Sequence, residues 1–254
     1  MCNSMRKYFG IYLEFDSIKY DQIIEDAVKN GTPGYCCAVE ANNLSYAHHH
    51  PDFMEVMNGA MVNSCDGAVI AKILAKIHHE NIDCYPGTDI FDIYTARGKY
   101  RQFFLGNTPE VLASLKENLV AKRDPKVADM RFETLPFQKV EEFDYQGIAD
   151  MINEDNPDII WVSLGAPKQE YFMARLKPYL KRGVMIGVGA AFNFNASVGK
   201  VKRSPEWMHR MRLLWLHRAF EEPKKNIPRY WRFIKLLPKL IWEEKKMLKE
   251  QRKM

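Results

Sequence analysis

One aspartate stands where a catalytic carboxylate could work, between an apolar run and a helical stretch. Asp66 lies in the segment Asn63-Ser64-Cys65-Asp66-Gly67, which follows a short apolar run. A carboxylate at the end of a strand can take a proton from a hydroxyl nucleophile. The structural alternative is an aspartate that caps the following helix beside a glycine turn. The spacing alone favours the helix cap.

A second segment has the composition of a phosphate-binding turn. Leu164–Glu170 (LGAPKQE) joins an apolar, strand-like run to a helical stretch. Its small residues let the backbone approach a ligand, and the N–H groups at the start of a helix attract phosphate. Lys168 adds a positive charge, while Gln169 and Glu170 can hydrogen-bond to hydroxyl groups. A plain tight turn explains these three polar residues less well.

Two other glycine-containing segments are weaker signals. Gly187–Phe192 (GVGAAF) is similar to the GxGxxG pattern of dinucleotide-binding proteins, but Phe192 replaces the last glycine. This disfavours a nicotinamide dinucleotide site and leaves a general nucleotide pocket open. Pro86-Gly87-Thr88-Asp89 by itself indicates only a turn before an apolar stretch.

The sequence predicts neither a metal centre nor a bound cofactor. Consecutive histidines on a helix point in different directions, so surface residues are the favoured interpretation of His48-His49-His50. The chain has no Asp-x-Asp pair to hold a divalent metal against a diphosphate. Its five cysteines are odd in number and form no CxxC, which favours reduced thiols in a cytosolic protein over disulfides or structural zinc.

Alternating apolar runs and helical stretches must position these residues. Strands are expected at 35–39, 101–105, 129–135, 158–164 and 184–188, and helices at 44–57, 68–79, 108–122, 147–153 and 168–182. Two of the strands, 158–164 and 184–188, are almost wholly apolar, which is typical of strands covered on both faces. The pattern predicts an α/β fold with a Rossmann-like, mostly parallel sheet flanked by helices. Ligands bind at the carboxyl ends of such strands.

The charge changes sign along the chain. Residues 1–199 carry a net charge of −6 and residues 200–254 one of +11. We expect an α/β core over 1–199 and a basic, amphipathic, helical C-terminal appendage over 200–254. The partner of the appendage should be anionic: a membrane surface, a diphosphate or a nucleic acid. Over Tyr230–Lys253 the tryptophans and basic residues favour a membrane surface, and packing on the protein's own core is the alternative.

Composition excludes several classes of protein. The 254 residues are 46% hydrophobic and 27% charged, which are ordinary globular values and exclude collagen-like, low-complexity and wholly disordered chains. Apolar runs stay shorter than the roughly 18 residues that cross a bilayer. The N-terminal residues do not have the pattern of a secretory signal.

Taken in order, the segments resemble the WecG/TagA/CpsF glycosyltransferase family over about Tyr35 to Tyr230. The most specific of them is Gly165–Glu170 (GAPKQE). The others are Asn42, Asp66-Gly67, Pro86–Asp89 (PGTD), Phe103–Gly106 (FFLG), Pro157–Val162 (PDIIWV), Gly187–Phe192, Arg203–Trp207 (RSPEW), Glu222-Pro223 and Arg229-Tyr230.

The resemblance implies an inverting, metal-independent glycosyltransferase that uses no cofactor. Such an enzyme would move N-acetylmannosamine or a related hexose from a UDP-sugar to a polyprenyl-diphosphate-linked acceptor, in the synthesis of bacterial surface polysaccharide. It would be cytoplasmic and peripherally associated with the inner face of the plasma membrane. It would not bind nucleic acid, and the resemblance leaves a homo-oligomer open.

The resemblance also implies roles for particular residues, with Asp66 as the catalytic base. The donor would be bound by Gly106, Gly165, Pro167, Lys168, Gln169, Glu170, Gly187, Gly189 and Phe192. The acceptor or a diphosphate would be bound by Asn42, Thr88, Asp89, Arg203, Arg218, Lys225 and Arg229. Some positions depart from the family pattern and bear on the sugar and acceptor preference: Glu40 replaces a threonine, Leu214 a glutamate and Ser204 an alanine, and the segment 196–199 is longer than usual.

Two other classes of function stay open on the sequence alone. A nucleotide-binding oxidoreductase would use the turn Gly187–Phe192 and bind reduced nicotinamide. A non-enzymatic binder of an anionic polymer would use the basic appendage, and its log affinity would fall steeply with log salt concentration. The non-enzymatic binder ranks last because the chain has no recognisable nucleic-acid-binding motif.

Overall fold

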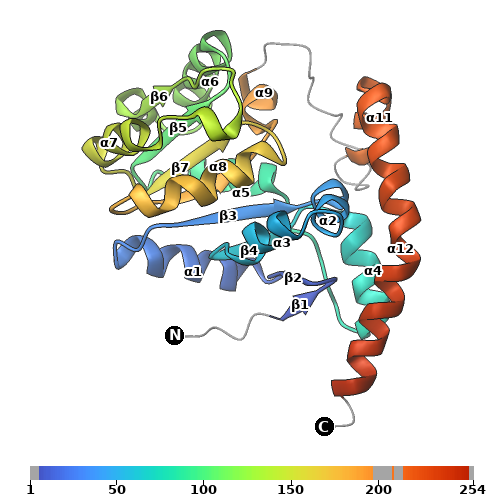
Figure 1. Cartoon of the computed structure of the whole chain (residues 1–254). Helices are drawn as coiled ribbons and strands as arrows, with labels where there is room; N and C mark the ends of the chain where they lie inside the picture. The colour runs from blue at the N-terminus through green and yellow to red at the C-terminus, as the bar shows by residue number, and fades with distance from the viewer. Residues whose placement is uncertain (1–5, 197–207, 209–213, 252–254) are drawn as a thin grey trace.

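A six-stranded parallel sheet forms the centre of the molecule (Figure 1). The computed structural model describes residues 6–196, Met208 and 214–251. The strand order is β4-β3-β8-β7-β5-β6, and every neighbouring pair in it is parallel. The strands are β3 Gly34–Val39, β4 Val62–Cys65, β5 Gln102–Gly106, β6 Arg131–Glu133, β7 Ile159–Ser163 and β8 Val184–Gly187, and a small antiparallel hairpin precedes them, β1 Lys7–Tyr8 with β2 Ile11–Tyr12. The predicted α/β fold with a parallel sheet is confirmed.

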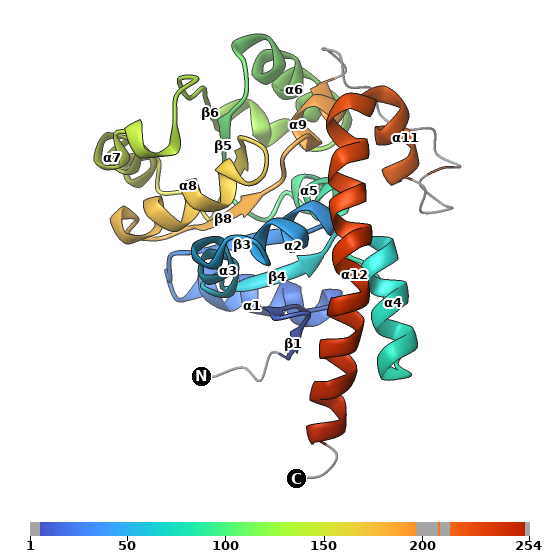
Figure 2. The same cartoon turned by 45° about the vertical axis from the view of Figure 1, so that its right-hand side comes forward.

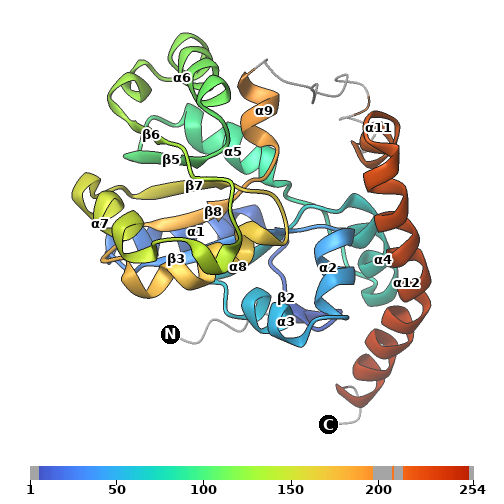
Figure 3. The same cartoon turned by 45° about the horizontal axis from the view of Figure 1, so that its top comes forward.

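Helices cover both faces of this sheet (Figure 3). Successive side chains of a strand point to opposite faces, and in β7 Ile160 and Val162 enter one hydrophobic cluster while Ile159 and Trp161 enter the other. The first cluster is closed mainly by α2 Ala41–Ala47, α3 Pro51–Asn58, α4 Ala68–His78, α7 Tyr145–Asp155 and α8 Lys168–Leu176. The second is closed by α1 Ser17–Lys29, α5 Gly87–Ala96, α6 Pro109–Lys122 and α9 Ala191–Ala196. Burial on both sides explains why β7 and β8 are apolar along their whole length.

Prolines and caps set the ends of several helices differently from the sequence expectation. The single helix expected over 44–57 is wrong, because Pro51 holds His50 in an extended conformation and starts α3 there. The turn expected at 86–89 is instead the start of α5, with Pro86 at its N-cap. Helix α6 begins as predicted, with the Thr108 side chain accepting a hydrogen bond from the Val111 N–H.

The long C-terminal helix α12, Pro223–Gln251, runs past the carboxyl end of β4 beside α2 and α4, and α11, Leu214–Glu221, packs on the start of α12 (Figure 2). Phe233 and Leu240 are buried in the same cluster as the core residues beneath those helices. This part of the basic appendage therefore packs on the protein's own core.

A buried carboxylate ties the far end of α12 to the N-terminal hairpin. Glu244 is 2% exposed and accepts hydrogen bonds from the Phe9 N–H (2.7 Å) and from His78 Nε2 (2.8 Å). His78 Nδ1 in turn lies 2.6 Å from an Arg6 guanidinium nitrogen, so it acts as an acceptor. Polar groups buried at this contact thus have partners, and removing α12 would leave them without one.

The opposite side of α12 carries large apolar side chains in contact with solvent. Trp231 is 57% exposed and Trp242 63% exposed. The spacing of the exposed residues follows one stripe of a helix, and they are Ile227, Trp231, Ile234 and Trp242. Among the described residues, no helix combines the length and the apolar character that a membrane span requires.

Candidate active site

A cleft of ≈ 370 Å³ opens at the carboxyl ends of the parallel strands. Its walls come from the residues that follow β3, β4, β5, β7 and β8, and from the segment where α11 meets α12. The volume lies in the range of small-molecule sites, about 300–1,000 Å³. The cleft is therefore at the edge of the sheet where α/β proteins bind ligands.

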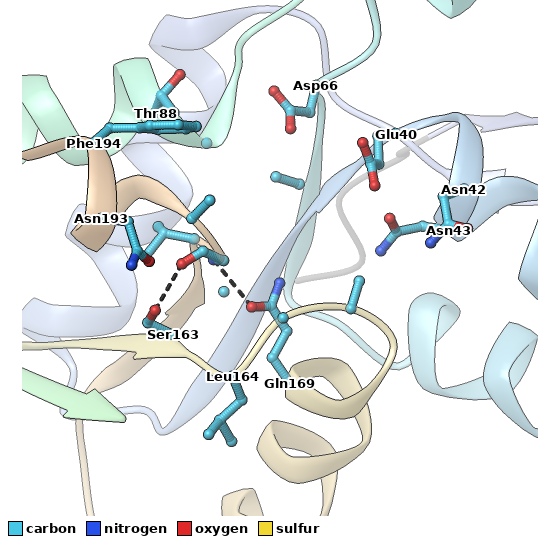
Figure 4. Close-up of a pocket in the computed structure, with 18 of the residues that line it drawn as sticks. Glu40, Asn42, Asn43, Asp66, Thr88, Ser163, Leu164, Gln169, Asn193 and Phe194 are labelled. Carbon is cyan, nitrogen blue, oxygen red and sulfur yellow. Dashed lines mark hydrogen bonds between the residues drawn. The ribbon is translucent and has the colours of Figure 1, made fainter. Parts of the chain in front are cut away.

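Two carboxylates come together because β3 and β4 are neighbours in register. Val39 and Cys65 are paired across the two strands, and the next residues along are Glu40 and Asp66. The Asp66 N–H donates to the Val39 carbonyl oxygen at 2.9 Å. Figure 4 shows the carboxyl groups of both residues directed into the cleft. The N-cap position of α4 belongs to Gly67, so Asp66 is not the helix cap that the spacing favoured.

Glycines form the wall on the β7 and β8 side. Gly165 and Gly189 have φ of +74° and +49°, in the left-handed region that suits glycine. A Cβ on Gly187 would lie 3.0 Å from Gln169 Nε2 and 2.8 Å from Met173 Cε, so this strand end must lack a side chain to pack on α8. Gln169 Oε1 accepts the Gly189 N–H at 3.1 Å and links the two turns (Figure 4).

A group of amides and a hydroxyl meets on the same wall, and sequence reasoning missed it. Asn107 Nδ2 donates to Ser163 Oγ (3.1 Å) and to Asn193 Oδ1 (3.0 Å). Ser163 Oγ donates to the Gly189 carbonyl oxygen at 2.7 Å. These three residues lie on three different segments, after β5, at the end of β7 and in α9. The one signal in the sequence is an asparagine, Asn107, directly after β5. In the structure it has a φ of +68°, which asparagine adopts more readily than most residues.

Several residues expected at the site line the cleft. They are Asn42, Asp66, Thr88, Gly165, Gln169, Gly187, Gly189 and Arg229. The cleft also contains polar residues that were not expected as ligand-binding groups: Glu40, Asn43, Asn107, Ser163, Asn193, Glu221, Glu222 and Asn226. Arg203 lies outside the described residues, and so do the side chains of Arg218 and Lys225.

Other expected residues support the site from behind instead of lining it. The Lys168 ammonium donates to the Gln138 carbonyl oxygen and lies over the Phe137 and Phe143 rings, at 5.3 and 5.1 Å from their centroids. Phe192 is fully buried against Phe91.

Three more of the expected residues, Gly106, Asp89 and Pro167, also lie outside the cleft lining. A Cβ on Gly106 would come within 2.8 Å of the Ser163 carbonyl oxygen, so this glycine lets β5 approach β7. Thr88 Oγ1 donates to the Asp89 carboxylate at 3.4 Å within the first turn of α5. Pro167 occupies the N-cap position of α8.

Glu170 lies beneath the cleft, fully buried. Its Oε1 accepts hydrogen bonds from Asn43 Nδ2 and Gln169 Nε2, both at 3.0 Å. Burial raises the pKa of this carboxyl to about 7. Burial likewise raises the pKa of the Cys37 thiol on β3, well above its ordinary value, which keeps it protonated.

The histidine run has separate structural contacts. His48 Nε2 lies 2.9 Å from the Phe9 carbonyl oxygen, His49 Nδ1 lies 2.7 Å from the Ser45 carbonyl oxygen, and His50 stacks on Tyr46. Among the residues that the structure describes, no cluster of three or more His, Cys, Asp or Glu side chains has the arrangement of a metal site.

A parallel α/β sheet with glycine turns, amides and carboxylates at its carboxyl edge defines a class: an α/β enzyme with a small-molecule site at the ends of its strands. The family model of the glycosyl transferase WecG/TagA/CpsF family matches residues 7–251. Because the match spans nearly the whole chain, the chain belongs to this family and is a glycosyltransferase. The predicted family is confirmed, and it excludes the oxidoreductase and the non-enzymatic binder.

A named relative is similar over most of its length. It is the N-acetylglucosaminyldiphosphoundecaprenol N-acetyl-beta-D-mannosaminyltransferase of Bacillus spizizenii (strain ATCC 23059 / NRRL B-14472 / W23). The two chains are 27% identical over 201 residues, which cover 77% of this chain and 72% of the relative.

Proposed function

We propose that this enzyme transfers N-acetylmannosamine, or a related hexose, from a UDP-sugar to a polyprenyl-diphosphate-linked sugar. The name of the Bacillus relative supports both the transferred sugar and the type of acceptor. The cleft supports a nucleotide-linked donor, because it has glycine turns and amides on one wall and carboxylates on the other. The reaction inverts the anomeric centre and needs no metal, consistent with a chain that has no Asp-x-Asp pair.

In the proposed reaction Asp66 is the general base. An acceptor hydroxyl attacks the anomeric carbon of the donor, and Asp66 takes the hydroxyl proton as the new C–O bond forms. The bond from the anomeric carbon to the diphosphate breaks on the opposite face, and UDP leaves with the bonding electron pair. The observation that carries this proposal is the Asp66 carboxyl at the end of β4, in the same cleft as the glycine turns of β7 and β8.

Charge on the departing diphosphate must be balanced by groups already in position. Gly165 lines the cleft with no side chain between its backbone and the ligand space, whereas the Gly189 N–H already donates to Gln169 Oε1. Arg229 of α12 faces the same cleft with a positive charge. Asn107, Ser163 and Asn193 are suited to the nucleoside, and Glu40 and Asn42 to sugar hydroxyls.

The location we propose is the cytoplasmic face of the plasma membrane, with α12 in contact with anionic lipid. The turn of α12 that lines the cleft with Asn226 and Arg229 exposes Ile227 and Trp231 to solvent. A lipid-linked acceptor is confined to that surface, so the same helix can hold the enzyme there and close the site. Residues 1–199 would then supply most of the catalytic groups and 200–254 the membrane contact.

A donor panel followed by a transfer assay tests this function. UDP-, GDP- and dTDP-sugars are compared by thermal shift in EDTA, and UDP-N-acetylmannosamine is then offered with a lipid-diphosphate-linked N-acetylglucosamine. We expect stabilisation by UDP-sugars, about 2.7 kcal/mol at 100 times the dissociation constant, and transfer that persists in EDTA. Stabilisation by GDP- or dTDP-sugars alone would contradict the donor, and transfer abolished by EDTA would contradict the metal-free mechanism.

A further inference from the structure

Glu170 joins two elements of the site without itself lining the cleft. The residue is 0% exposed, and its Oε1 accepts from Asn43 of α2 and from Gln169 of α8. Both donors face the cleft. Gln169 also accepts the Gly189 N–H through its carbonyl oxygen, so one carboxyl group connects the side-chain amides of Asn43 and Gln169 to the turn at Gly189.

Two buried oxygens in this cluster accept no hydrogen bond from the described residues. Within the described part of the chain, Glu170 Oε2 and Asn43 Oδ1 are buried acceptors to which no group donates. They belong to the same hydrogen-bonded pair, since Asn43 Nδ2 already donates to Glu170 Oε1. A buried acceptor without a donor is costly. One added proton makes Oε2 a donor, and a carboxylic acid can donate to the carbonyl oxygen of an amide whose N–H bonds to its other oxygen.

We propose that Glu170 is a positioning residue that keeps a proton in the working enzyme and closes a two-bond acid–amide pair with Asn43. The pair fixes the orientation of the Asn43 amide, and the second bond to Oε1 fixes that of Gln169. Loss of the proton sets a carboxylate oxygen against Asn43 Oδ1 and loosens both amides. The inference rests on the proposed function only in taking the ligand held by these amides to be a UDP-sugar.

The surroundings of Glu170 favour the protonated form near neutral pH. Burial is the main cause of its raised pKa, and the negative charge of Glu40, which follows β3, acts in the same direction. Cys37 faces Glu170 from β3 and stays neutral because its own pKa is raised. Hydrogen bonds from Gln169, from the Glu170 backbone N–H and from Asn43 act in the opposite direction by stabilising the carboxylate. The balance leaves the pKa of Glu170 raised to about 7.

A titration of the two side-chain amides tests the proton directly, with no ligand present. The ¹⁵N-labelled amide resonances of Asn43 and Gln169 are followed from pH 5.5 to 8.5 in the native enzyme and in Glu170→Gln. We expect both amides to shift together in one step near pH 7 in the native enzyme. Glutamine reproduces the protonated acid, so Glu170→Gln should lack the step and resemble the native enzyme at low pH.

Glu40→Gln is the matched control, since it removes the neighbouring carboxylate. The step should move to lower pH in this variant and persist, because the charge of Glu40 raises the pKa of Glu170. Native amides that do not titrate, or a step that survives in Glu170→Gln, would overturn the proposal. A step abolished by Glu40→Gln alone would assign the proton to Glu40 and overturn it as well.

The dissociation constant for UDP tests whether the proton on Glu170 affects ligand binding. Native enzyme and Glu170→Gln are compared at each pH, so that ionisation of UDP cancels in the ratio of their dissociation constants. We expect native enzyme to lose about tenfold in affinity relative to Glu170→Gln between pH 6 and 8, the loss of about one hydrogen bond. Glu170→Ala should bind weakly at both pH values.

These measurements distinguish failure of the positioning role of Glu170 from failure of the proposed function. A ratio that does not change with pH, although the amides titrate, would overturn the positioning role of Glu170. Native enzyme that binds no UDP at any pH would contradict the proposed function, and the amide titration would still decide where the proton lies.

Discussion

At the scale of single residues, two carboxylates share the cleft and only one is assigned as the base. Asp66→Asn should lower transfer by about 10²–10⁴, the usual contribution of a general base, and leave UDP binding nearly unchanged. Stability should hold, since Gly67 and not Asp66 is the cap of α4. Transfer rates and UDP affinities of the purified variant check this expectation.

Glu40→Gln is the control for that variant, because Glu40 and Asp66 follow paired residues of adjacent strands. It should alter the affinity for the sugar substrates more than the rate of the chemical step. A larger loss of rate in Glu40→Gln than in Asp66→Asn would give the role of base to Glu40.

Glu170 also makes a prediction about stability that needs no substrate. Its pKa is about 7 in the folded protein against an ordinary value of 4.5, so the folded state holds a proton that the unfolded chain releases between these values. The stabilisation is complete below about pH 4.5 and is lost as pH rises towards 7, at 1.36 kcal/mol per unit of pKa shift. Glu170→Gln lacks this dependence.

Urea unfolding of native enzyme and Glu170→Gln at several pH values measures that difference. From pH 5 to pH 8 the variant should gain about 3 kcal/mol relative to the native enzyme. Parallel curves of unfolding free energy against pH would show that Glu170 is ionised in the folded state throughout.

At the scale of elements, the site depends on how closely β8 packs on α8. Gly187→Ala should displace Gln169, since the new methyl group would lie 3.0 Å from Gln169 Nε2. Met173 Cε is the end of a flexible side chain and can move aside. We expect weaker UDP binding, by about tenfold for one misplaced hydrogen-bonding group, with a small loss of stability. Calorimetric UDP titration and thermal melting check the two effects.

Gly34→Ala is a suitable control in the same sheet. Gly34 begins β3, at the opposite end from its carboxyl edge, and the nearest atoms to a Cβ there belong to the side chain of Met61. It should perturb stability without weakening UDP binding. Equal losses of affinity in the two variants would show that the effect of Gly187→Ala is a general disturbance of the sheet.

At the scale of the whole molecule, α12 combines a buried face with an apolar face in solvent. Residues 223–251 contain nine Lys or Arg and three Glu, and Lys235 and Lys246 lie over the exposed rings of Trp231 and Trp242. Trp231→Glu with Trp242→Glu should abolish sedimentation with anionic vesicles while the protein stays folded. Each basic residue near such a surface contributes about 1 kcal/mol, and salt should weaken binding of the native enzyme.

These surface substitutions test membrane binding better than removal of the helix. Phe233, Leu240 and Glu244 are buried against the core, so truncation at Tyr230 would expose core residues. Ile18→Glu is the matched control, an exposed isoleucine on α1 outside the stripe. Sedimentation of the double variant equal to that of the native enzyme would leave the exposed face of α12 without a membrane role.

Features that depend on local pattern could be predicted from the amino-acid sequence. Fully apolar runs predict strands covered on both faces, and their alternation with helical stretches predicts the parallel sheet. Because parallel strands end at one edge, the segments after β4, β7 and β8 could be placed near one another before their contacts were known. The amphipathic pattern of Tyr230–Lys253 also predicted a helix, which is the C-terminal part of α12.

Features that depend on strand order and on packing between distant segments became known only from the folded structure. The pairing of β3 with β4 sets Glu40 beside Asp66, and Asn107, Ser163 and Asn193 meet only because β5, β7 and α9 are neighbours. A lysine in a phosphate-binding pattern could point either way, and the loop at Gln138 takes the charge of Lys168 away from the cleft. The contact of Glu170 with Asn43 follows likewise from the folding of the chain, which no spacing along the chain encodes, since these side chains are more than a hundred residues apart.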